Sequence, residues 1–277
     1  MKNNPPNTLE AVQQKIVSNQ GVLSNRVLIA TPATGLVRME WVSARYGQAI
    51  PTNWSHVEFI QYMSSYVPLG FQVCDAENIV AKQMVEGGFE WLLFIEHDNV
   101  LPVNTFIKMN QYMIKGDIPV VGGLYFTKSI PPEPMIYRAP GKGYYADWKL
   151  GDKVWCRGLP FGCTLIHSSI IKALWAEAPE YKVGEQVTRH VFKHPEAKDD
   201  EVGFFNISGT TDLQFCNECI EKKIFEKAGW PEMQKKEFPF LVDTSIFVKH
   251  IDNNGNQYPL NMPLEFLQGK VTLKSIL

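Results

Sequence analysis

The sequence predicts an α/β fold with a mostly parallel central sheet flanked by helices. Two short runs, Val27–Ala30 and Trp91–Ile95, are continuously apolar and contain β-branched and aromatic residues. Runs without polar alternation are typical of strands that are buried on both faces, as central parallel strands are. Strand-like and helix-like segments alternate from residue 26 to residue 126, which is the pattern of a parallel sheet with helical crossovers.

The first strand is predicted over residues 26–32, where the apolar run ends in Thr31-Pro32 and enters a loop. Residues 54–66 carry large apolar groups at helix-like spacing, so they predict a helix. Residues 71–74 form a short apolar run that predicts the second strand.

The next elements have clear boundary signals. Asp75 stands at the N-cap position of a helix predicted over residues 76–86, and Gly87-Gly88 ends that helix. Pro102 suits the first turn of a later helix. The other elements of the first half are a strand at 91–95, the helix at 102–115 and a strand at 119–126.

The pattern changes after residue 126. Residues 128–143 contain four prolines, which exclude regular helix and central strand. The polar stretch 180–201 has few apolar anchors and predicts a mobile excursion or lid. The remaining predicted elements are strands at 154–157, 161–166, 204–207 and 246–249, and helices at 168–177, capped by Ser168, and at 211–225.

The composition is that of a folded globular protein, with 45% hydrophobic and 20% charged residues among 277. A formal net charge of -2 gives no reason to expect a broad nucleic-acid-binding surface. The five cysteines are sparse and odd in number, which fits free thiols in a reducing compartment. The N-terminus lacks the features of a signal peptide, and no apolar run reaches the ~18–20 residues that cross a bilayer. We therefore expect a cytoplasmic protein without a transmembrane segment.

An acidic pair follows the strand predicted at 91–95. In open parallel sheets ligands bind beyond the carboxyl ends of the strands, which places Glu96-His97-Asp98 on one rim with Thr31-Pro32 and Cys74-Asp75. Partly buried carboxylates are costly unless they are paired or bind a metal. Mg²⁺ or Mn²⁺ commonly takes one or two protein carboxylates together with substrate phosphates, so the pair predicts a divalent cation site. In the alternative, Glu96 caps a turn and Asp98 caps the following helix.

The segment Gly88–Asp98, with the helix before it, resembles the segment that delivers the Asp-x-Asp motif of GT-A-fold nucleotide-sugar glycosyltransferases of the family 2 type. The resemblance implies a Rossmann-like GT-A fold with a smaller β element on the acceptor side. It also implies one catalytic domain over 26–250, with a nucleotide half at 26–126 and an acceptor half at 127–250. The flanking parts are a lead-in at 1–25, with a short helix at 9–17, and a tail at 251–277.

The same resemblance assigns the metal ligands. Asp98 matches the second acid of the motif and is the expected ligand, whereas Glu96 replaces the first aspartate and would ligate the metal or touch the ribose or a water. The run Phe247–Ile251 resembles the late strand whose histidine completes the metal shell, so His250 is the other expected ligand. The alternative for His250 is an ordinary surface or core histidine.

Two segments resemble the acceptor side of the family. Residues 161–166 are similar to its glycine-containing strand, and residues 209–216 are similar to its Gly-x-(Glu/Asp)-Asp-x-x-Phe segment, with Thr211 in place of the first acid. Asp212 is then the catalytic candidate, as a general base in an inverting enzyme or as an acceptor-binding group in a retaining one. In the alternative it is an acid that the helix dipole favours. The acceptor-side candidates are Gly123, Tyr125, Gly162 and Thr211.

The nucleotide candidates come from the ends of the first strands. Thr31 and Pro32 match the position where the family's backbone holds the base, Asp75 is a candidate for the base edge or the ribose, and Asn78 fits a slot that often carries Arg-Asn. Glu96 and His97 complete this set. His97 is not an expected metal ligand, because alternation along the strand points it away from its neighbours.

The resemblance implies a metal-dependent hexosyltransferase that uses Mn²⁺ or Mg²⁺ and moves a sugar from a nucleoside diphosphate sugar, of UDP or GDP type, to a hydroxyl acceptor. Two alternatives stay open: a nucleotidyltransferase acting on a sugar phosphate, and a non-catalytic carbohydrate-binding protein with a degenerate site. The acceptor, whether glycan, lipid, protein or modified nucleobase, and the choice between retention and inversion stay open as well.

Overall fold

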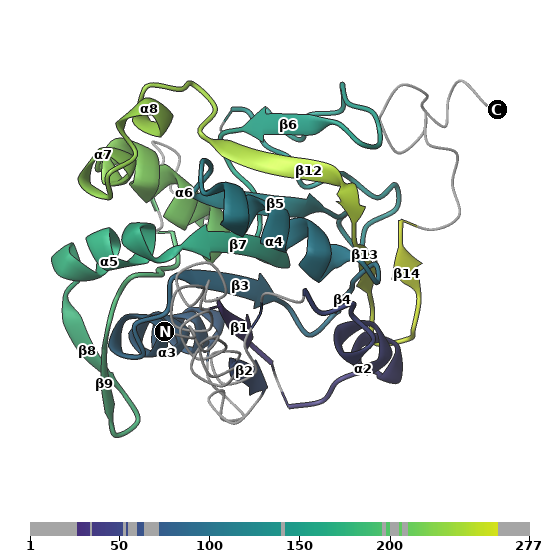
Figure 1. Cartoon of the computed structure of the whole chain (residues 1–277), viewed down its shortest axis with the longest axis horizontal. Coiled ribbons are helices and arrows are strands. Elements are labelled where there is room, and N and C mark those ends of the chain that lie inside the picture. Colours follow the sequence, from purple (N-terminus) through teal and green to yellow (C-terminus); the bar gives the residue numbers. More distant parts are fainter. Residues whose placement is uncertain are drawn as a thin grey trace, which may run out of the picture.

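The computed structural model describes residues 27–33, 35–51, 54, 60–63, 72–139, 142–195, 198–199, 205–206 and 210–259. Its centre is a seven-stranded sheet in the order β2-β1-β3-β7-β5-β12-β6, seen from bottom to top in Figure 1. The strands are β1 (Val27–Thr31), β2 (Ile60–Met63), β3 (Trp91–Ile95), β5 (Val120–Leu124), β6 (Lys153–Cys156), β7 (Cys163–His167) and β12 (Phe240–Phe247).

Most strands of this sheet run in one direction. Strand β1 is parallel to β2 and β3, and β5 is parallel to β12. Strand β7 lies antiparallel between β3 and β5, and β6 is antiparallel to β12 at the edge. The five strands β1, β2, β3, β5 and β12 therefore share one direction, and every residue of β1, β3 and β5 is buried. The predicted α/β architecture with a mostly parallel sheet is confirmed.

Helices flank the sheet on both sides. Helix α4 crosses in front of β5 and β7 in Figure 1, while α3 packs on α5, and α7 packs on α5, α6 and α8. Gly116 ends α4 in the left-handed conformation (φ +60°), which glycine adopts without strain. The helices are α2 (Met39–Tyr46), α3 (Val73–Glu86), α4 (Thr105–Lys115), α5 (Ser168–Glu177), α6 (Thr211–Glu221), α7 (Ile224–Lys227) and α8 (Pro231–Gln234).

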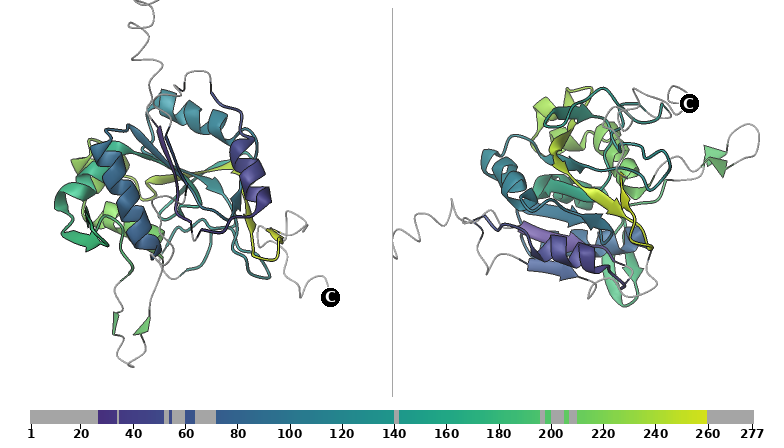
Figure 2. Two further views of the ribbon diagram at one scale, coloured as in Figure 1. Left: turned by 90° about the horizontal axis from the view of Figure 1, so that it is seen from below. Right: turned by 90° about the vertical axis from the view of Figure 1, so that its right-hand side faces the viewer.

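A second, smaller sheet stands at the carboxyl ends of β3 and β12, beside α2 in Figures 1 and 2. It has the order β14-β13-β4, with β4 at Asn99–Val100, β13 at Lys249–Ile251 and β14 at Gln257–Tyr258. Because β4 follows β3 and β13 follows β12, the pairing of His250 with Asn99 joins distant parts of the chain. The domain end expected at residue 250 falls inside β13.

Two predictions about the first half are wrong. Helix-like spacing at 54–66 predicted a helix, but Ile60–Met63 is strand β2, which pairs in parallel with β1. Pairing with the neighbouring strand overrides the local spacing of apolar residues. A strand was predicted at 71–74, but α3 already begins at Val73. The N-cap of α3 is Gln72 rather than Asp75, which lies in the first helical turn. A four-residue apolar run is too short to distinguish strand from helix.

The second half also departs from prediction. The expected lid at 180–201 contains an antiparallel hairpin of β8 (Glu180–Val183) and β9 (Gln186–Arg189), which packs on α3. Strand β10 (Lys198–Asp199) pairs with β11 (Phe205–Asn206). The N-cap of α5 is His167, whose side chain accepts a hydrogen bond from the Ser169 amide, rather than Ser168. The predicted helix at 9–17 lies outside the described residues.

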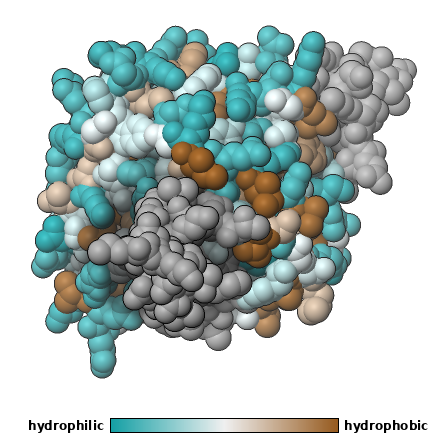
Figure 3. Space-filling view, viewed as in Figure 1, coloured by the Kyte–Doolittle hydropathy of each residue, from teal (hydrophilic) through white to brown (hydrophobic). Residues whose placement is uncertain are grey.

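The surface seen in Figure 3 is mostly hydrophilic, with hydrophobic residues gathered near its middle. Helix α4, which faces the viewer there, exposes Ile107 and Ile114. Within the described ranges no helix is long and apolar enough to cross a membrane.

Candidate functional site

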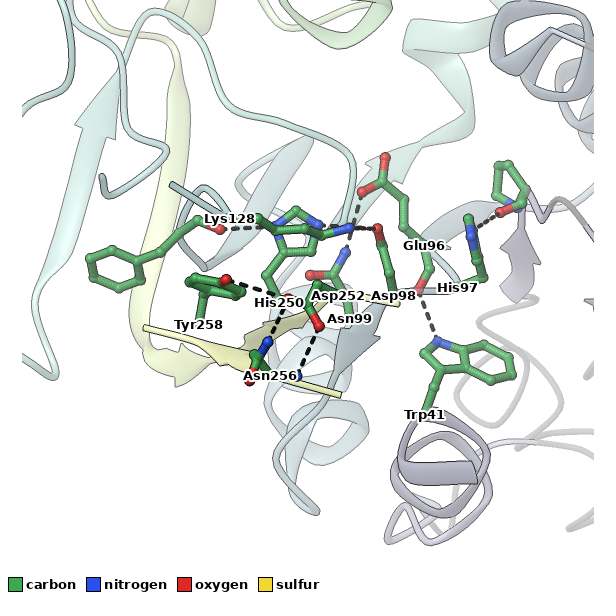
Figure 4. Close-up of polar contacts among 12 residues, drawn as sticks. Trp41, Glu96, His97, Asp98, Asn99, Lys128, His250, Asp252, Asn256 and Tyr258 are labelled. Carbon is green, nitrogen blue, oxygen red and sulfur yellow. Dashed lines mark hydrogen bonds and ion pairs between the residues drawn. The ribbon is translucent and has the colours of Figure 1, made fainter. Parts of the chain in front are cut away.

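The acidic step after β3 is fixed through the backbone of Glu96. The Glu96 amide donates to the Gly162 carbonyl at 3.1 Å, and the Glu96 carbonyl accepts from the Trp41 indole Nε1 at 2.8 Å and from the Asn99 amide at 3.2 Å. Trp41 is fully buried in α2, a helix that the sequence did not predict. Figure 4 shows the indole reaching the backbone of the step. Three elements therefore hold the position from which the two carboxylates project.

Gly162 and Tyr125 pack against the turn that carries Glu96. The Gly162 amide donates to the Tyr125 hydroxyl at 2.7 Å. A Cβ on Gly162 would lie 2.4 Å from Asn99 Nδ2 and from the Tyr125 hydroxyl, so only glycine fits there. Asn99 is fully buried and donates from Nδ2 to Glu96 Oε2 at 3.2 Å. Gly162 and Tyr125 were expected on the acceptor side, and in the structure they pack against the acidic step.

Asp98 and His250 meet across the small sheet. His250 Nε2 lies 3.2 Å from Asp98 Oδ2, and His250 Nδ1 lies 2.9 Å from the Phe126 carbonyl oxygen. Because a carbonyl can only accept, Nδ1 carries a proton and Nε2 is the atom that faces Asp98. The Ile251 amide donates to the Asp98 carbonyl at 2.7 Å, which holds the two backbones together. The structure thus brings the two predicted metal ligands into contact.

Lys128 is a third member of this group, and the sequence did not predict it. Its ammonium pairs with Asp98 Oδ2 at 2.5 Å, so one carboxylate oxygen faces both Lys128 and His250. Burial alone would raise the pKa of Asp98, but hydrogen bonds and charges from His250 and Lys128 lower that pKa far below its usual range. Figure 4 shows both basic side chains converging on Asp98, which is therefore ionised at neutral pH. No sequence signal marked Lys128, since it lies in a proline-rich segment without regular structure.

A cavity of about 480 Å³ opens beside these residues. Its lining combines the side chains of Glu96, Asp98, Lys128 and His250 with residues that follow β1, residues of α3 and His97. The volume is within the range of small-molecule sites. The described lining residues are Pro32, Ala33, Val73, Ala76, Glu96, His97, Asp98, Thr127, Lys128, Met135 and His250.

Of the residues predicted to bind the nucleotide, some line the cavity and others do not. Pro32 and His97 line the cavity and are joined by a contact of 3.2 Å between His97 Nδ1 and the Pro32 carbonyl oxygen. Thr31 is buried in β1 behind them. Asp75 and Asn78 do not line the cavity. Instead they tie α3 to the β8–β9 hairpin and the segment after it.

Those ties use the polar atoms of both side chains. Asn78 donates from Nδ2 to the Phe192 carbonyl and accepts from the Phe192 amide, at 2.9 and 2.8 Å, and Nδ2 also donates to the Tyr181 hydroxyl at 2.9 Å. Asp75 accepts from that same hydroxyl at 2.8 Å. Asp75 and Asn78 thus have structural contacts, and their role in nucleotide binding stays a prediction.

Asp212 begins α6, and only 8% of its surface is exposed. Its Oδ1 accepts from the Leu213 amide at 2.8 Å and from the Thr210 hydroxyl. Burial raises the pKa of Asp212 to about 6, although hydrogen bonds from backbone amides oppose that shift. Among the described residues Asp212 does not line the cavity, but its charge helps to raise the pKa of Glu96 and Tyr125.

Glu96 differs from Asp98 in its protonation. Burial, followed by the charges of Asp98 and Asp212, raises the pKa of Glu96 to about 8 in spite of Lys128 and Asn99. Glu96 is therefore mainly protonated at neutral pH, while Asp98 is ionised. The structure thus separates the acidic pair into one anionic carboxylate and one neutral carboxyl group.

Glu77 of α3 is a buried carboxyl that the sequence did not predict as part of the site. It is 2% exposed, its Oε1 accepts from the Thr211 hydroxyl at 3.2 Å, and none of the described residues donates a hydrogen bond to its Oε2. Burial raises the pKa of Glu77 well above its ordinary value, and Asp212 and Glu96 add to the shift. Thr211 is thus bound to Glu77 rather than presented to an acceptor.

Gly123, another acceptor-side candidate, lies within the core. A Cβ there would lie 3.0 Å from both the side chain and the carbonyl oxygen of Ile246 and 3.2 Å from Val248. The residue allows β5 to pack against β12 where the register of that pair shifts. Its role is therefore in the sheet.

The Asp98 and His250 side chains fit a divalent cation. With Nδ1 donating to the Phe126 carbonyl, a neutral His250 turns its Nε2 lone pair toward Asp98 Oδ2, and two acceptor atoms at 3.2 Å require a proton or a cation between them. A carbonyl that fixes the tautomer in this way is the usual support of a metal-bound histidine. Within the described part of the chain no three His, Cys, Asp or Glu side chains form a metal cluster. Two ligands suffice where phosphates and water complete the shell.

Comparisons with known proteins add little. No family model and no curated protein matches the sequence. Among solved structures, the crystal structure of A197 from STIV matches with a TM-score of 0.48 at 14% sequence identity, covering 86% of this chain and 95% of that chain. A similarity of this size carries no inference about activity, which has to be inferred from the site itself.

Proposed function

We propose that the protein is a metal-dependent glycosyltransferase with a GT-A-type fold, which moves a hexose from a nucleoside diphosphate sugar to a hydroxyl acceptor. The observation that carries the proposal is the Asp98–His250 pair, which meets at the carboxyl end of β3 beside a cavity of about 480 Å³. The resemblance of the acidic step, the Asp212 segment and the late histidine to that enzyme family supports it.

The strand order independently favours a nucleotide in this cavity. The chain runs from β1 outward to β2 and then crosses to β3 on the other side of β1, so the connections diverge between β1 and β3. Ligands of open α/β sheets bind at such a point, beyond the carboxyl ends of the strands. Pro32 and Ala33 after β1, and Glu96 to Asp98 after β3, line the cavity there. The apolar lining residues Pro32, Ala33 and Ala76 suit a base, and the charged side chains of Asp98 and Lys128 suit a metal-bound diphosphate.

Asp98 and His250 would hold Mn²⁺ or Mg²⁺ in this proposal. The bound ion supplies positive charge that stabilises the departing diphosphate. Asp98 offers an ionised oxygen, and His250 would offer its Nε2 lone pair once the metal takes the place of the proton between Nε2 and Asp98, while Nδ1 keeps its contact with Phe126. Glu96, mainly protonated at neutral pH, is better suited to a hydrogen bond with the donor than to direct ligation.

Asp212 is proposed to act on the acceptor. A pKa of about 6 leaves it ionised at neutral pH yet basic enough to accept a proton as the acceptor hydroxyl attacks. In an inverting enzyme the hydroxyl oxygen would form the new bond to the sugar carbon, the bond from that carbon to the diphosphate would break, and the proton would pass to Asp212.

The proposed location is the cytoplasm. All five cysteines are free thiols, and four of them, Cys156, Cys163, Cys216 and Cys219, are buried without forming a disulfide. Free buried thiols fit a reducing compartment.

Calorimetric titration of UDP and GDP, each with and without Mn²⁺, tests the proposal. We expect one nucleotide to bind in a metal-dependent manner and Asp98→Asn to abolish that dependence. Asp117→Asn, which removes a surface carboxylate paired with Lys115 outside the cavity, is the matched control. If neither nucleotide binds with or without the metal, the proposal is wrong. Metal-dependent binding without hydrolysis of any UDP- or GDP-hexose would instead favour a non-catalytic carbohydrate-binding protein.

A further inference from the structure

We propose that Lys128 is an internal counter-ion that occupies Asp98 until the diphosphate of the donor draws it away, so that metal and donor bind cooperatively. The inference rests on the proposed function, because it concerns the same site. It goes further by assigning the coupling between the two ligands to one side chain.

The geometry places Lys128 in competition with a metal ion. Its Nζ lies 2.5 Å from Asp98 Oδ2, the same oxygen that faces His250 Nε2 at 3.2 Å. A cation that binds both Asp98 and His250 must lie beside that oxygen, where the ammonium now is. A divalent cation beside that oxygen would be strongly repelled by an ammonium at this range. Metal binding to Asp98 therefore requires Lys128 to leave.

The backbone that carries Lys128 is held in place, while its side chain is free to move. The Thr127 amide donates to the Glu133 carbonyl and the Glu133 amide donates to Thr127 Oγ1, both at 2.9 Å, which closes the turn between them. The Lys128 side chain is 34% exposed and ends a flexible four-carbon stem. Lys128 can thus exchange partners without any change in the turn.

A ligand in the cavity could also give the Lys128 ammonium another anionic partner. Thr127 and Lys128 line the same cavity as Asp98, and Lys128 is its one lysine or arginine among the described lining residues. A diphosphate that enters the cavity carries several anionic oxygens and would meet this ammonium. Pairing with phosphate replaces the pairing with Asp98 and leaves the carboxylate free for the metal.

This exchange predicts a specific linkage. If the nucleotide releases Asp98 from Lys128, then the nucleotide raises the affinity for metal, and the metal raises the affinity for nucleotide by the same factor. Without Lys128, Asp98 keeps only its contact with His250, the other proposed metal ligand. The metal alone should then bind more tightly, and the nucleotide should gain less from it.

The test is to measure free Mn²⁺ by electron paramagnetic resonance during titration of the full-length protein, first alone and then with saturating UDP or GDP. In the wild type we expect the nucleotide to raise Mn²⁺ affinity about tenfold or more. In Lys128→Met, which removes the charge but keeps an unbranched apolar chain, Mn²⁺ alone should bind about tenfold more tightly and the coupling factor should fall clearly below the wild-type value, with direct ligation of the metal by phosphate accounting for the remainder. Lys128→Arg should keep the coupling, and Lys149→Met, at an exposed lysine outside the cavity, should behave as the wild type.

Two results would overturn the inference and are distinct. If Mn²⁺ binds with nucleotide but Lys128→Met shows wild-type affinity and coupling, Lys128 is not the counter-ion, and the proposed function stands. If Mn²⁺ binds neither protein with either nucleotide, both the inference and the metal-dependent function fail.

Discussion

Asp98 Oδ2 and His250 Nε2 lie 3.2 Å apart although 152 residues separate them in the sequence. The contact depends on the small sheet, because Asn99 pairs with His250 there and the Ile251 amide binds the Asp98 carbonyl. The two side chains are thus placed by backbone pairing rather than by loops. This placement makes the roles of individual residues testable.

Removal of the His250 imidazole should weaken metal binding without unfolding the protein. His250→Gln keeps an amide able to hydrogen bond but removes the ring nitrogen that faces Asp98, so we expect Mn²⁺ affinity to fall at least ~10-fold. The measurement is Mn²⁺ titration in the presence of nucleotide, with thermal unfolding as the check on folding. His190→Gln, which removes a ring stacked on Tyr181 away from the cavity, is the control. Unchanged affinity in His250→Gln would exclude the histidine as a ligand.

Asp212→Asn should separate binding from transfer. The substitution keeps the size of the side chain and removes its basicity, so donor binding should persist while the transfer rate falls ~10²–10⁴-fold. In the wild type the rate should decline as the pH falls below about 6, where the carboxylate becomes protonated. Product formation measured across pH provides both results. A variant that transfers sugar at the wild-type rate would remove Asp212 from the catalytic group.

Glu77 should make the ligand-free protein less stable as the pH rises. Its pKa is raised in the folded state relative to ~4.3 in the unfolded chain, so the folded state holds the proton more tightly. Its contribution to stability is fully present below the unfolded pKa and is lost as the pH rises through the folded pKa. Glu77→Gln cannot ionise and should therefore reduce the decline in unfolding free energy with pH.

Urea unfolding from about pH 5 to about pH 9 measures that slope. Asp212 and Glu96, whose pKa values are raised to about 6 and about 8, contribute to the same decline and remain in the variant. The slope should therefore become smaller without vanishing. Glu180→Gln, at a residue exposed to solvent in β8, is the control. Equal slopes for wild type and Glu77→Gln would show that Glu77 does not bind its proton more tightly in the folded state.

Gly162→Ala should destabilise the protein and disturb the site together. The added Cβ would lie 2.4 Å from Asn99 Nδ2 and the Tyr125 hydroxyl, both tightly packed, so we expect a loss of ~1–3 kcal/mol or more in unfolding free energy. Gly143→Ala isolates backbone strain, because its Cβ would meet nothing within 4 Å while its φ is +72°. A smaller loss for Gly162→Ala than for Gly143→Ala would contradict the packing described at Gly162.

Asn78→Ala should affect stability rather than nucleotide binding. The change leaves the buried amide and carbonyl of Phe192 without their side-chain partners, at a cost of ~1–3 kcal/mol for each unsatisfied group. Nucleotide affinity, measured by calorimetry under conditions where the variant is folded, should stay at the wild-type value. A large loss of affinity would restore Asn78 to the nucleotide site.

The sequence predicted the parts of the fold that depend on local, continuous signals. The buried strands at 27–31 and 91–95 and the helix ended by Gly116 have periodicity and boundary residues that local physics can interpret. Strand β2 could not be recognised, because its pairing with β1 rather than its own spacing determines its conformation. Helix α2 was missed for a similar reason: its buried Trp41 is held by the Glu96 carbonyl, a tertiary partner.

The same distinction between local signals and tertiary contacts applies to the candidate site. Asp98 and His250 were placed in one site by the resemblance of their segments to the GT-A family, and the structure brings them into contact, while their role as metal ligands stays a prediction. Lys128 could not be predicted, because its position beside Asp98 is produced by a turn in a proline-rich segment. Gly162 and Tyr125 were expected near the site, but their contact with each other could not be predicted, since it is visible only in three dimensions.

The late position of β13 also bears on synthesis of the protein. The central sheet is complete once β12 has formed, but His250 reaches Asp98 only when the following residues have left the ribosome and paired with β4. A nascent chain can therefore bury its core before it can bind a metal at this pair. Metal capture would then report that the whole domain has been made, and an unfinished chain would be inert toward the donor.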